Sequence, residues 1–218
     1  MHVNSGLVGV VEGTVWYRDA LMDLRRFGMA LLASSALVTD LRAQTAAPES
    51  VAEIQNRHDR SLVRELGEYL IKNPKAEDRD QAYAALFNKV IEHDWFAENQ
   101  EAAERYLKES PDGPVKSLAQ VITVMGRAKA KQFPEALARY QELIQGLTLA
   151  EQEEFASSFS ETFAAAAVAA GEIGTAAQVY QTLAAKFPES AAVKQRAEAE
   201  LGRLARVGKP APNIEATD

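Results

Sequence analysis

Apolar residues recur at helical spacing throughout residues 50–206, and this periodicity restricts the possible folds more than any other feature of the sequence. We find no convincing β-strand alternation in this stretch, and Asp112-Gly113 is followed by Pro114 instead of a second strand. Glycine and proline residues separate the periodic segments, so the connections are short and favour antiparallel neighbours. The sequence therefore predicts an all-α fold of antiparallel helical hairpins with about eight helices.

The first predicted helix carries signals at both of its ends. Ser50 followed by Glu53 is the pattern of a capping box. Asn73-Pro74 stops the helix, because the residue before a proline is pushed out of helical geometry. We expect its buried face to contain Ile54, Leu62, Leu66, Tyr69 and Leu70. Beyond it we expect helices over residues 77–93, 97–109, 115–131, 134–146, 150–170, 174–187 and 190–206.

A short pattern that begins with alanine and ends in tyrosine occurs three times in these helices. Ala102–Tyr106 recurs as Ala136–Tyr140 after 34 residues and as Ala176–Tyr180 after a further 40. A small residue early in the second helix of a hairpin lets the two helices approach closely, and an aromatic residue one turn later fills the space between neighbouring hairpins. In the last copy we expect Gly171 to make the turn and Pro188 to end the unit.

Over residues 80–205 this pattern resembles the tetratricopeptide repeat, whose unit is about 34 residues long. The alanine-rich residues 164–170 would then form the facing surface of the partner helix. The resemblance implies stacked hairpins with a concave groove that binds a peptide or protein. A generic stack of helical hairpins outside that family predicts the same packing. Helix phase selects five candidate groove residues: Lys89, Asn99, Arg127, Lys131 and Arg139.

The first 49 residues differ in character from the predicted helices. Arg25-Arg26 precedes the apolar run Phe27–Val38, which has the length of a signal-peptide core and is too short to span a bilayer. We therefore predict an over-called N-terminal extension over residues 1–21, a signal peptide over residues 22–43 and a linker over residues 44–49. The protein is expected to be exported, to the periplasm or cell envelope, with no membrane span left after cleavage. The alternative is an amphipathic or buried N-terminal helix.

Composition excludes several chemistries. The chain has no cysteine, so thiolate zinc sites, cysteine nucleophiles and dithiol redox chemistry are absent from these residues. A net charge of −7 argues against nucleic acid as the main partner. The histidines His2, His58 and His93 are too scattered to predict a histidine metal site. We therefore predict no metal ligands and no cofactor.

Two adjacent pairs look catalytic at first sight. His58-Asp59 and His93-Asp94 each join an imidazole to a carboxylate, but neighbouring residues on a helix point about 100° apart, so neither pair converges. Trp95-Phe96 is expected to be a core anchor at a helix junction. No convergent acid, base and nucleophile are visible, so we predict no catalytic residue in this chain.

The final stretch, Val207–Asp218, breaks the helical pattern, because Pro210 and Pro212 force extended backbone. Its opening Val-Gly-Lys-Pro-Ala-Pro resembles the start of redoxin domains, the thioredoxin-fold modules of TlpA-like and peroxiredoxin-like exported proteins. The resemblance covers 12 residues. It implies that residues 207–218 are a linker and the first residues of a redoxin domain, whose catalytic cysteines would lie beyond Asp218.

These observations favour one function and leave a second open. We expect a non-catalytic, exported protein-interaction region of a thiol–disulfide oxidoreductase, whose helices bind a partner protein, a substrate polypeptide or the redoxin domain itself. The alternative is a stand-alone tetratricopeptide-like adaptor of the cell envelope that binds a peptide or protein.

Overall fold

The protein is represented by a computed structural model that describes residues 50–148 and 152–209. All regular secondary structure in these two ranges is helical, which confirms the prediction of an all-α fold. The eight helices of the described residues are α2 (Val51–Lys72), α3 (Arg79–Glu92), α4 (Phe96–Glu109), α5 (Lys116–Lys129), α6 (Phe133–Gly146), α7 (Glu153–Ala169), α8 (Ile173–Lys186) and α9 (Ala191–Leu204).

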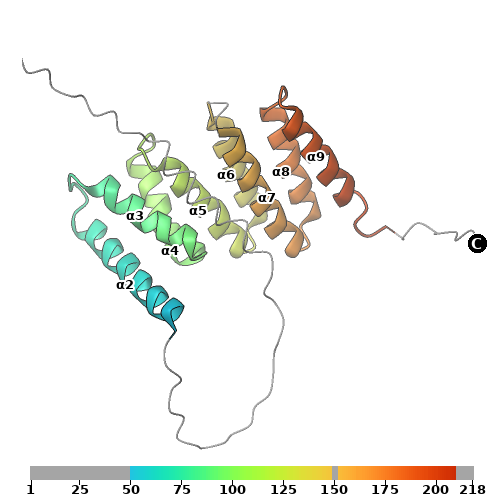
Figure 1. The fold of residues 1–218 in the computed structure, drawn as a ribbon. Coiled ribbons are helices and arrows are strands. Elements are labelled where there is room, and N and C mark those ends of the chain that lie inside the picture. The colour runs from blue at the N-terminus through green and yellow to red at the C-terminus, as the bar shows by residue number, and fades with distance from the viewer. Residues whose placement is uncertain (1–49, 149–151, 210–218) are drawn as a thin grey trace, which may run out of the picture.

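The helices form a row of stacked hairpins, with α2 at one end and α9 at the other (Figure 1). Consecutive helices pack against each other at most steps of the row. In addition, α3 contacts α5, α5 contacts α7, and α6 contacts α8. Because helices two apart in the chain are also neighbours, the hairpins stack side by side in two layers.

The ends of α2 form as its local sequence dictates. The Ser50 hydroxyl accepts a hydrogen bond from the Glu53 amide at 3.2 Å, and the Glu53 carboxylate accepts one from the Ser50 amide at 2.7 Å, which confirms the capping box. At the other end Asn73 is the C-cap, and its side-chain amide donates to the Tyr69 carbonyl at 3.0 Å. Both ends of this helix are therefore determined by residues within one turn.

The predicted buried face of α2 is partly wrong. Ile54 and Leu62 are 36% and 40% exposed, whereas the helix buries Val63 and Leu70. In the described residues α2 packs mainly against one neighbour, α3. A terminal helix of this kind needs only a narrow buried strip, and the direction of that strip depends on its neighbour rather than on its own periodicity.

The three repeated tyrosines lie in the core, as expected. Tyr106 and Tyr140 are fully buried and Tyr180 is buried. The Tyr106 hydroxyl accepts a hydrogen bond from the amide of Val115, just before α5, at 3.3 Å. The Tyr140 hydroxyl of α6 pairs with Ser160 of α7 at 2.6 Å. The Tyr106 side chain of α4 therefore reaches the start of α5, and the Tyr140 side chain of α6 reaches α7. Each of these side chains links one helical hairpin to the next.

Small residues permit the close approach of the helices, with one shift from the expected pattern. Ala136 and Ala176 are fully buried, but in α4 the fully buried alanine is Ala103, one residue after the predicted Ala102. Gly171 makes the turn after α7 with a φ of +83°, a left-handed conformation that glycine adopts without strain.

Most of what the sequence predicts for the two ends of the chain lies outside the described residues. The extension, signal peptide and linker over residues 1–49 lie outside the described residues, as does the proline-containing part of the tail, residues 210–218. Helix α9 ends at Leu204, close to the predicted break. None of the helices described has the length and apolar content that crossing a membrane requires.

The contact between Gly113 and Tyr106 gives a direct test of this packing. A Cβ atom on Gly113 would lie 2.1 Å from the Tyr106 hydroxyl oxygen, so the buried ring or the turn would have to shift. We expect Gly113→Ala to lower the free energy of unfolding by about 1–3 kcal/mol, measured by urea denaturation.

Gly67, in the middle of α2, supplies the matched control. A Cβ atom there meets nothing within 4 Å, and alanine favours a helix interior by about 1 kcal/mol over glycine. Gly67→Ala should therefore stabilise the protein slightly. If both substitutions changed the free energy of unfolding equally, the close contact between Gly113 and Tyr106 would be refuted.

Candidate functional site

The five predicted groove residues occupy separate places in the fold. They lie on α3 (Lys89), α4 (Asn99), α5 (Arg127), the turn after α5 (Lys131) and α6 (Arg139). Four of the five have partners within the chain: Lys89 pairs with Asp59 at 3.1 Å, the Asn99 amide donates to the Trp95 carbonyl at 2.9 Å, Arg127 of α5 pairs with Glu104 of α4 at 2.6 Å, and Arg139 pairs with Glu142 at 2.8 Å. In the described part of the chain no hydrogen bond or ion pair joins any two of the five. Their role in binding a partner stays a prediction.

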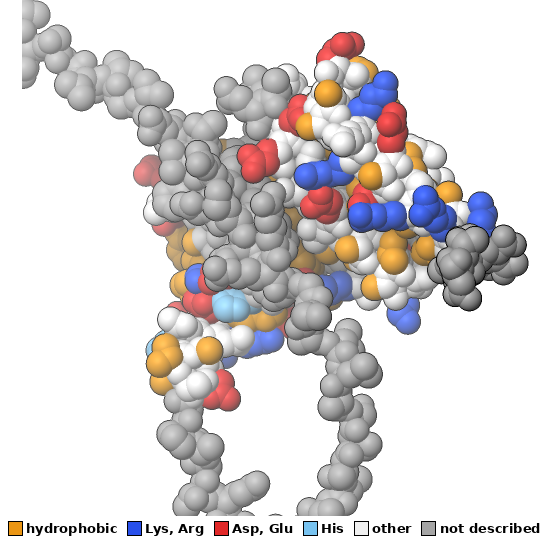
Figure 2. All heavy atoms as spheres, turned by 45° about the vertical axis from the view of Figure 1, so that its right-hand side comes forward, with side chains coloured by type: hydrophobic (Ala, Val, Ile, Leu, Met, Phe, Trp, Pro, Cys, Tyr) orange, Lys and Arg blue, Asp and Glu red, His pale blue; other side chains and the backbone are white. Residues whose placement is uncertain are grey.

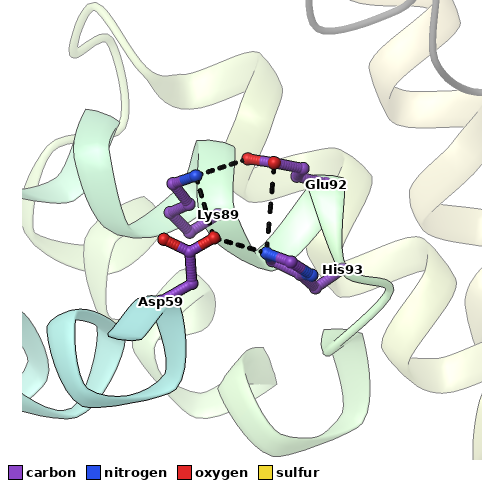
Figure 3. A network of polar contacts seen from close by, with 4 residues as sticks. All are labelled: Asp59, Lys89, Glu92 and His93. Atoms are coloured by element: carbon purple, nitrogen blue, oxygen red, sulfur yellow. Dashed lines mark hydrogen bonds and ion pairs between the residues drawn. The ribbon is translucent and has the colours of Figure 1, made fainter. Parts of the chain in front are cut away.

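Lys89 belongs to a denser group at the junction of α2 and α3, which we call the polar cluster: Asp59, Lys89, Glu92 and His93 (Figure 3). Asp59 Oδ2 lies 2.7 Å from His93 Nε2 and 3.1 Å from Lys89 Nζ. Lys89 Nζ also lies 2.8 Å from Glu92 Oε2, and His93 Nε2 lies 4.0 Å from Glu92 Oε1. Two carboxylates, one ammonium and one imidazole thus share one small space.

The local sequence explains why three of these side chains are together. Lys89 and Glu92 are three residues apart on α3 and therefore face the same side of the helix. His93 is the C-cap residue of α3, and Asp94 after it turns the chain with a φ of +61°. Only Asp59 comes from another helix, the middle of α2.

The cluster is partly shielded from solvent. Burial disfavours the charged forms of Asp59 and Lys89, whereas their hydrogen bonds and ion pairs favour these forms. The Asp59 side chain is 18% exposed and the His93 side chain 19%. Burial is the largest effect on Asp59 and opposes its ionisation, but the bonds from His93 and Lys89 together outweigh it, so the pKa of Asp59 lies below its ordinary value. Burial likewise disfavours the charged form of Lys89, and bonds to Glu92 and Asp59 outweigh it, so the pKa of Lys89 is raised.

The aromatic ring of Trp95 packs against the polar cluster. The Trp95 ring stacks on the His93 imidazole, with centroids 4.3 Å apart and planes 12° from parallel. The Arg60 guanidinium of α2 lies 4.4 Å from the centroid of the Trp95 ring and also pairs with Glu98 of α4 at 3.2 Å. Trp95 and Phe96 are buried, as predicted for a junction anchor. Through these contacts α2 is tied to both α3 and α4.

A surface cavity of about 480 Å³ opens beside the cluster. The four cluster residues line it together with Gln55, Asn56 and His58 of α2. The cavity gives solvent access to an imidazole and two carboxylates. The cluster itself contains no hydroxyl or thiol nucleophile, so its chemistry is that of charge pairing and ligation, not of covalent catalysis.

Sequence reasoning missed this cluster because it compared neighbours in the chain. His58-Asp59 and His93-Asp94 do not converge as adjacent pairs, but Asp59 of the first meets His93 of the second across 34 residues. That separation equals the spacing of the first two tyrosine patterns, so a comparison of polar residues one repeat apart could have suggested the contact.

Comparison with known proteins adds no relative. No family model, no curated protein and no solved structure matches this chain. Nothing in these comparisons indicates a catalytic activity. Arguments about function therefore depend on the fold and on the site.

Substitution of Asp59 tests whether the cluster holds α2 in place. Asp59→Asn removes the charge that Lys89 and His93 contact, so we expect the free energy of unfolding to fall by about 1–3 kcal/mol at neutral pH. Hydrogen exchange should show the loss of protection mainly in α2. Glu68→Gln on the same helix removes only an exposed pair with Lys72 and should change stability by less than about 0.5 kcal/mol. Equal effects of the two substitutions would contradict the role of the cluster.

Acidification provides a second test. Because the pKa of Asp59 is lowered in the fold, the unfolded chain takes up this proton first as the pH falls. The stabilisation from Asp59 is therefore complete above its unfolded pKa of about 3.9 and is lost as the pH falls through the lowered folded pKa. The difference in unfolding free energy between wild type and Asp59→Asn should shrink below about pH 4. A difference that grows there would refute the assignment.

Proposed function

We propose that this chain is a non-catalytic, exported helical module that binds or positions a partner protein. The stacked hairpins support the proposal, because helical repeats of this kind offer long continuous surfaces to polypeptide partners. The observation that carries it is the repeated tyrosine: Tyr106, Tyr140 and Tyr180 are each buried in the C-terminal half of their helices, α4, α6 and α8. That repetition is the tetratricopeptide-like feature of the chain.

The mixed surface charge fits a protein partner. Basic and acidic side chains are interspersed over the end of the stack that carries α8 and α9 (Figure 2). Nucleic-acid binding relies on a concentrated basic patch, whereas this chain has a net charge of −7. Binding of a polypeptide therefore agrees better with the surface than binding of nucleic acid does.

In the fuller form of the proposal, the partner is a redoxin domain or its substrate. The support is the redoxin-like opening in Val207–Asp218 together with the export-like segment that contains Phe27–Val38. The helical module would place a substrate polypeptide near the thiols of the redoxin domain. The second candidate is a stand-alone adaptor, which needs only the tetratricopeptide-like pattern over residues 80–205 and treats residues 207–218 as a plain tail.

The messenger RNA and the natural protein distinguish these two forms. We expect the reading frame to continue past the codon of Asp218 into a thioredoxin-like domain that contains cysteine. We expect N-terminal sequencing of the protein from its envelope fraction to begin near Gln44. A stop codon directly after Asp218 would remove the redoxin form and leave the adaptor. Recovery of an uncleaved protein from the cytoplasm would refute export.

Binding by the predicted groove can be tested with a matched pair of arginines. Arg139 and Arg203 each pair with a glutamate three residues away on an exposed helix face. The partner is first identified by cross-linking to the full chain in its natural host. We then expect Arg139→Gln to weaken binding of that partner at least about fivefold in a titration.

Arg203→Gln on α9 is the control, because it breaks a similar ion pair outside the predicted groove. Its affinity should equal that of the wild type. Equal loss in both variants, or no loss in either, would show that the groove is not formed by these residues.

A further inference from the structure

Three side chains able to bind a metal ion meet at the junction of α2 and α3. One donor atom each from Asp59, Glu92 and His93 lies within 4.8 Å of the other two. Imidazole nitrogen and carboxylate oxygen bind Zn²⁺ at about 2.0–2.2 Å, so two ligands of a tetrahedral ion lie about 3.4 Å apart. The observed separations from His93 Nε2, 2.7 Å to Asp59 and 4.0 Å to Glu92, lie on either side of that value. Small side-chain rotations would bring all three to ligand distance.

The ammonium group of Lys89 already occupies the position between the two carboxylates. Lys89 Nζ lies 3.1 Å from Asp59 Oδ2 and 2.8 Å from Glu92 Oε2, between the two carboxylates. An ion bound there must displace this ammonium group. The lysine stem is flexible and its side chain is 29% exposed, so the group can move into solvent. Metal binding at this junction is therefore a competition between a divalent ion and Lys89.

The surroundings meet the other requirements of a metal site. The stacked Trp95 ring restricts the plane of the His93 imidazole, in the way that outer contacts orient a metal-bound histidine. The cavity of about 480 Å³ beside the cluster provides a path for the ion and space for water as a fourth ligand. An imidazole with two carboxylates suits zinc better than magnesium or calcium, which prefer oxygen alone.

We propose that the α2–α3 junction binds one Zn²⁺ through Asp59, Glu92 and His93, and that Lys89 competes with the ion for the two carboxylates. Such an ion would link the middle of α2 to the end of α3. Among the residues described, α2 buries Val63 and Leu70 and packs Leu66 and Tyr69 partly against the core, so this link would add to a small packing contact. Zinc would therefore stabilise the docked position of α2 by mass action.

Zinc titration of the full chain tests the proposal. We expect isothermal titration with ZnCl₂ to show one saturable site and native mass spectrometry to show one zinc per chain. Lys89→Met should tighten binding by about tenfold, because it removes the competing charge and keeps an unbranched side chain of similar length. Glu92→Gln and His93→Gln should each weaken it by about 10- to 100-fold.

Glu101→Gln on α4 is the control, since that carboxylate is almost fully exposed and outside the cluster; it should bind zinc as the wild type does. Circular dichroism checks folding, and Glu92, at the exposed edge of the cluster, gives a variant that should fold even if His93→Gln does not. Absence of a saturable site in both wild type and Lys89→Met would overturn the proposal. Undiminished zinc binding by a folded Glu92→Gln variant would do the same.

Discussion

The stack of hairpins depends on the burial of large aromatic side chains whose polar ends find partners inside the core. Tyr140 is fully buried, and its hydroxyl contacts the Ser160 hydroxyl at 2.6 Å and the Val179 carbonyl at 3.2 Å. One side chain of α6 thereby contacts both α7 and α8. Burial also raises the pKa of Tyr140, which keeps the ring neutral at any physiological pH. A buried hydroxyl without these partners would cost about 1–3 kcal/mol, which would offset much of what the ring gains by packing.

The N-terminal end of the described stack is held differently. Helix α2 buries Val63 and Leu70 and packs Leu66 and Tyr69 partly against the core. It also makes polar or cation–π contacts through Asp59, Arg60 and Tyr69. Partly exposed charge pairs respond to salt and pH, whereas buried packing does so very little. Changes in solution conditions should therefore act first on α2 and leave the central hairpins intact.

Central hairpins held by buried packing and an end helix held partly by charge contacts suit a protein-binding module. A rigid centre keeps the surface that a partner would contact in one shape, which lowers the entropic cost of binding. An end helix held by charge can adjust without disturbing that centre. The proposed zinc site lies at the same end, so an ion there would strengthen the attachment of α2.

The sequence by itself determined the helices and the burial of the repeated tyrosines. Ser50 with Glu53, Asn73-Pro74 and the tyrosine repeat act through contacts within a turn or through one repeated unit, so periodicity and capping rules were sufficient to predict them. Only the tertiary structure decided which way α2 faces and that Asp59 meets His93. The physical reason is that the rotation of a terminal helix and a contact across 34 residues depend on how the hairpins stack, which no local rule specifies.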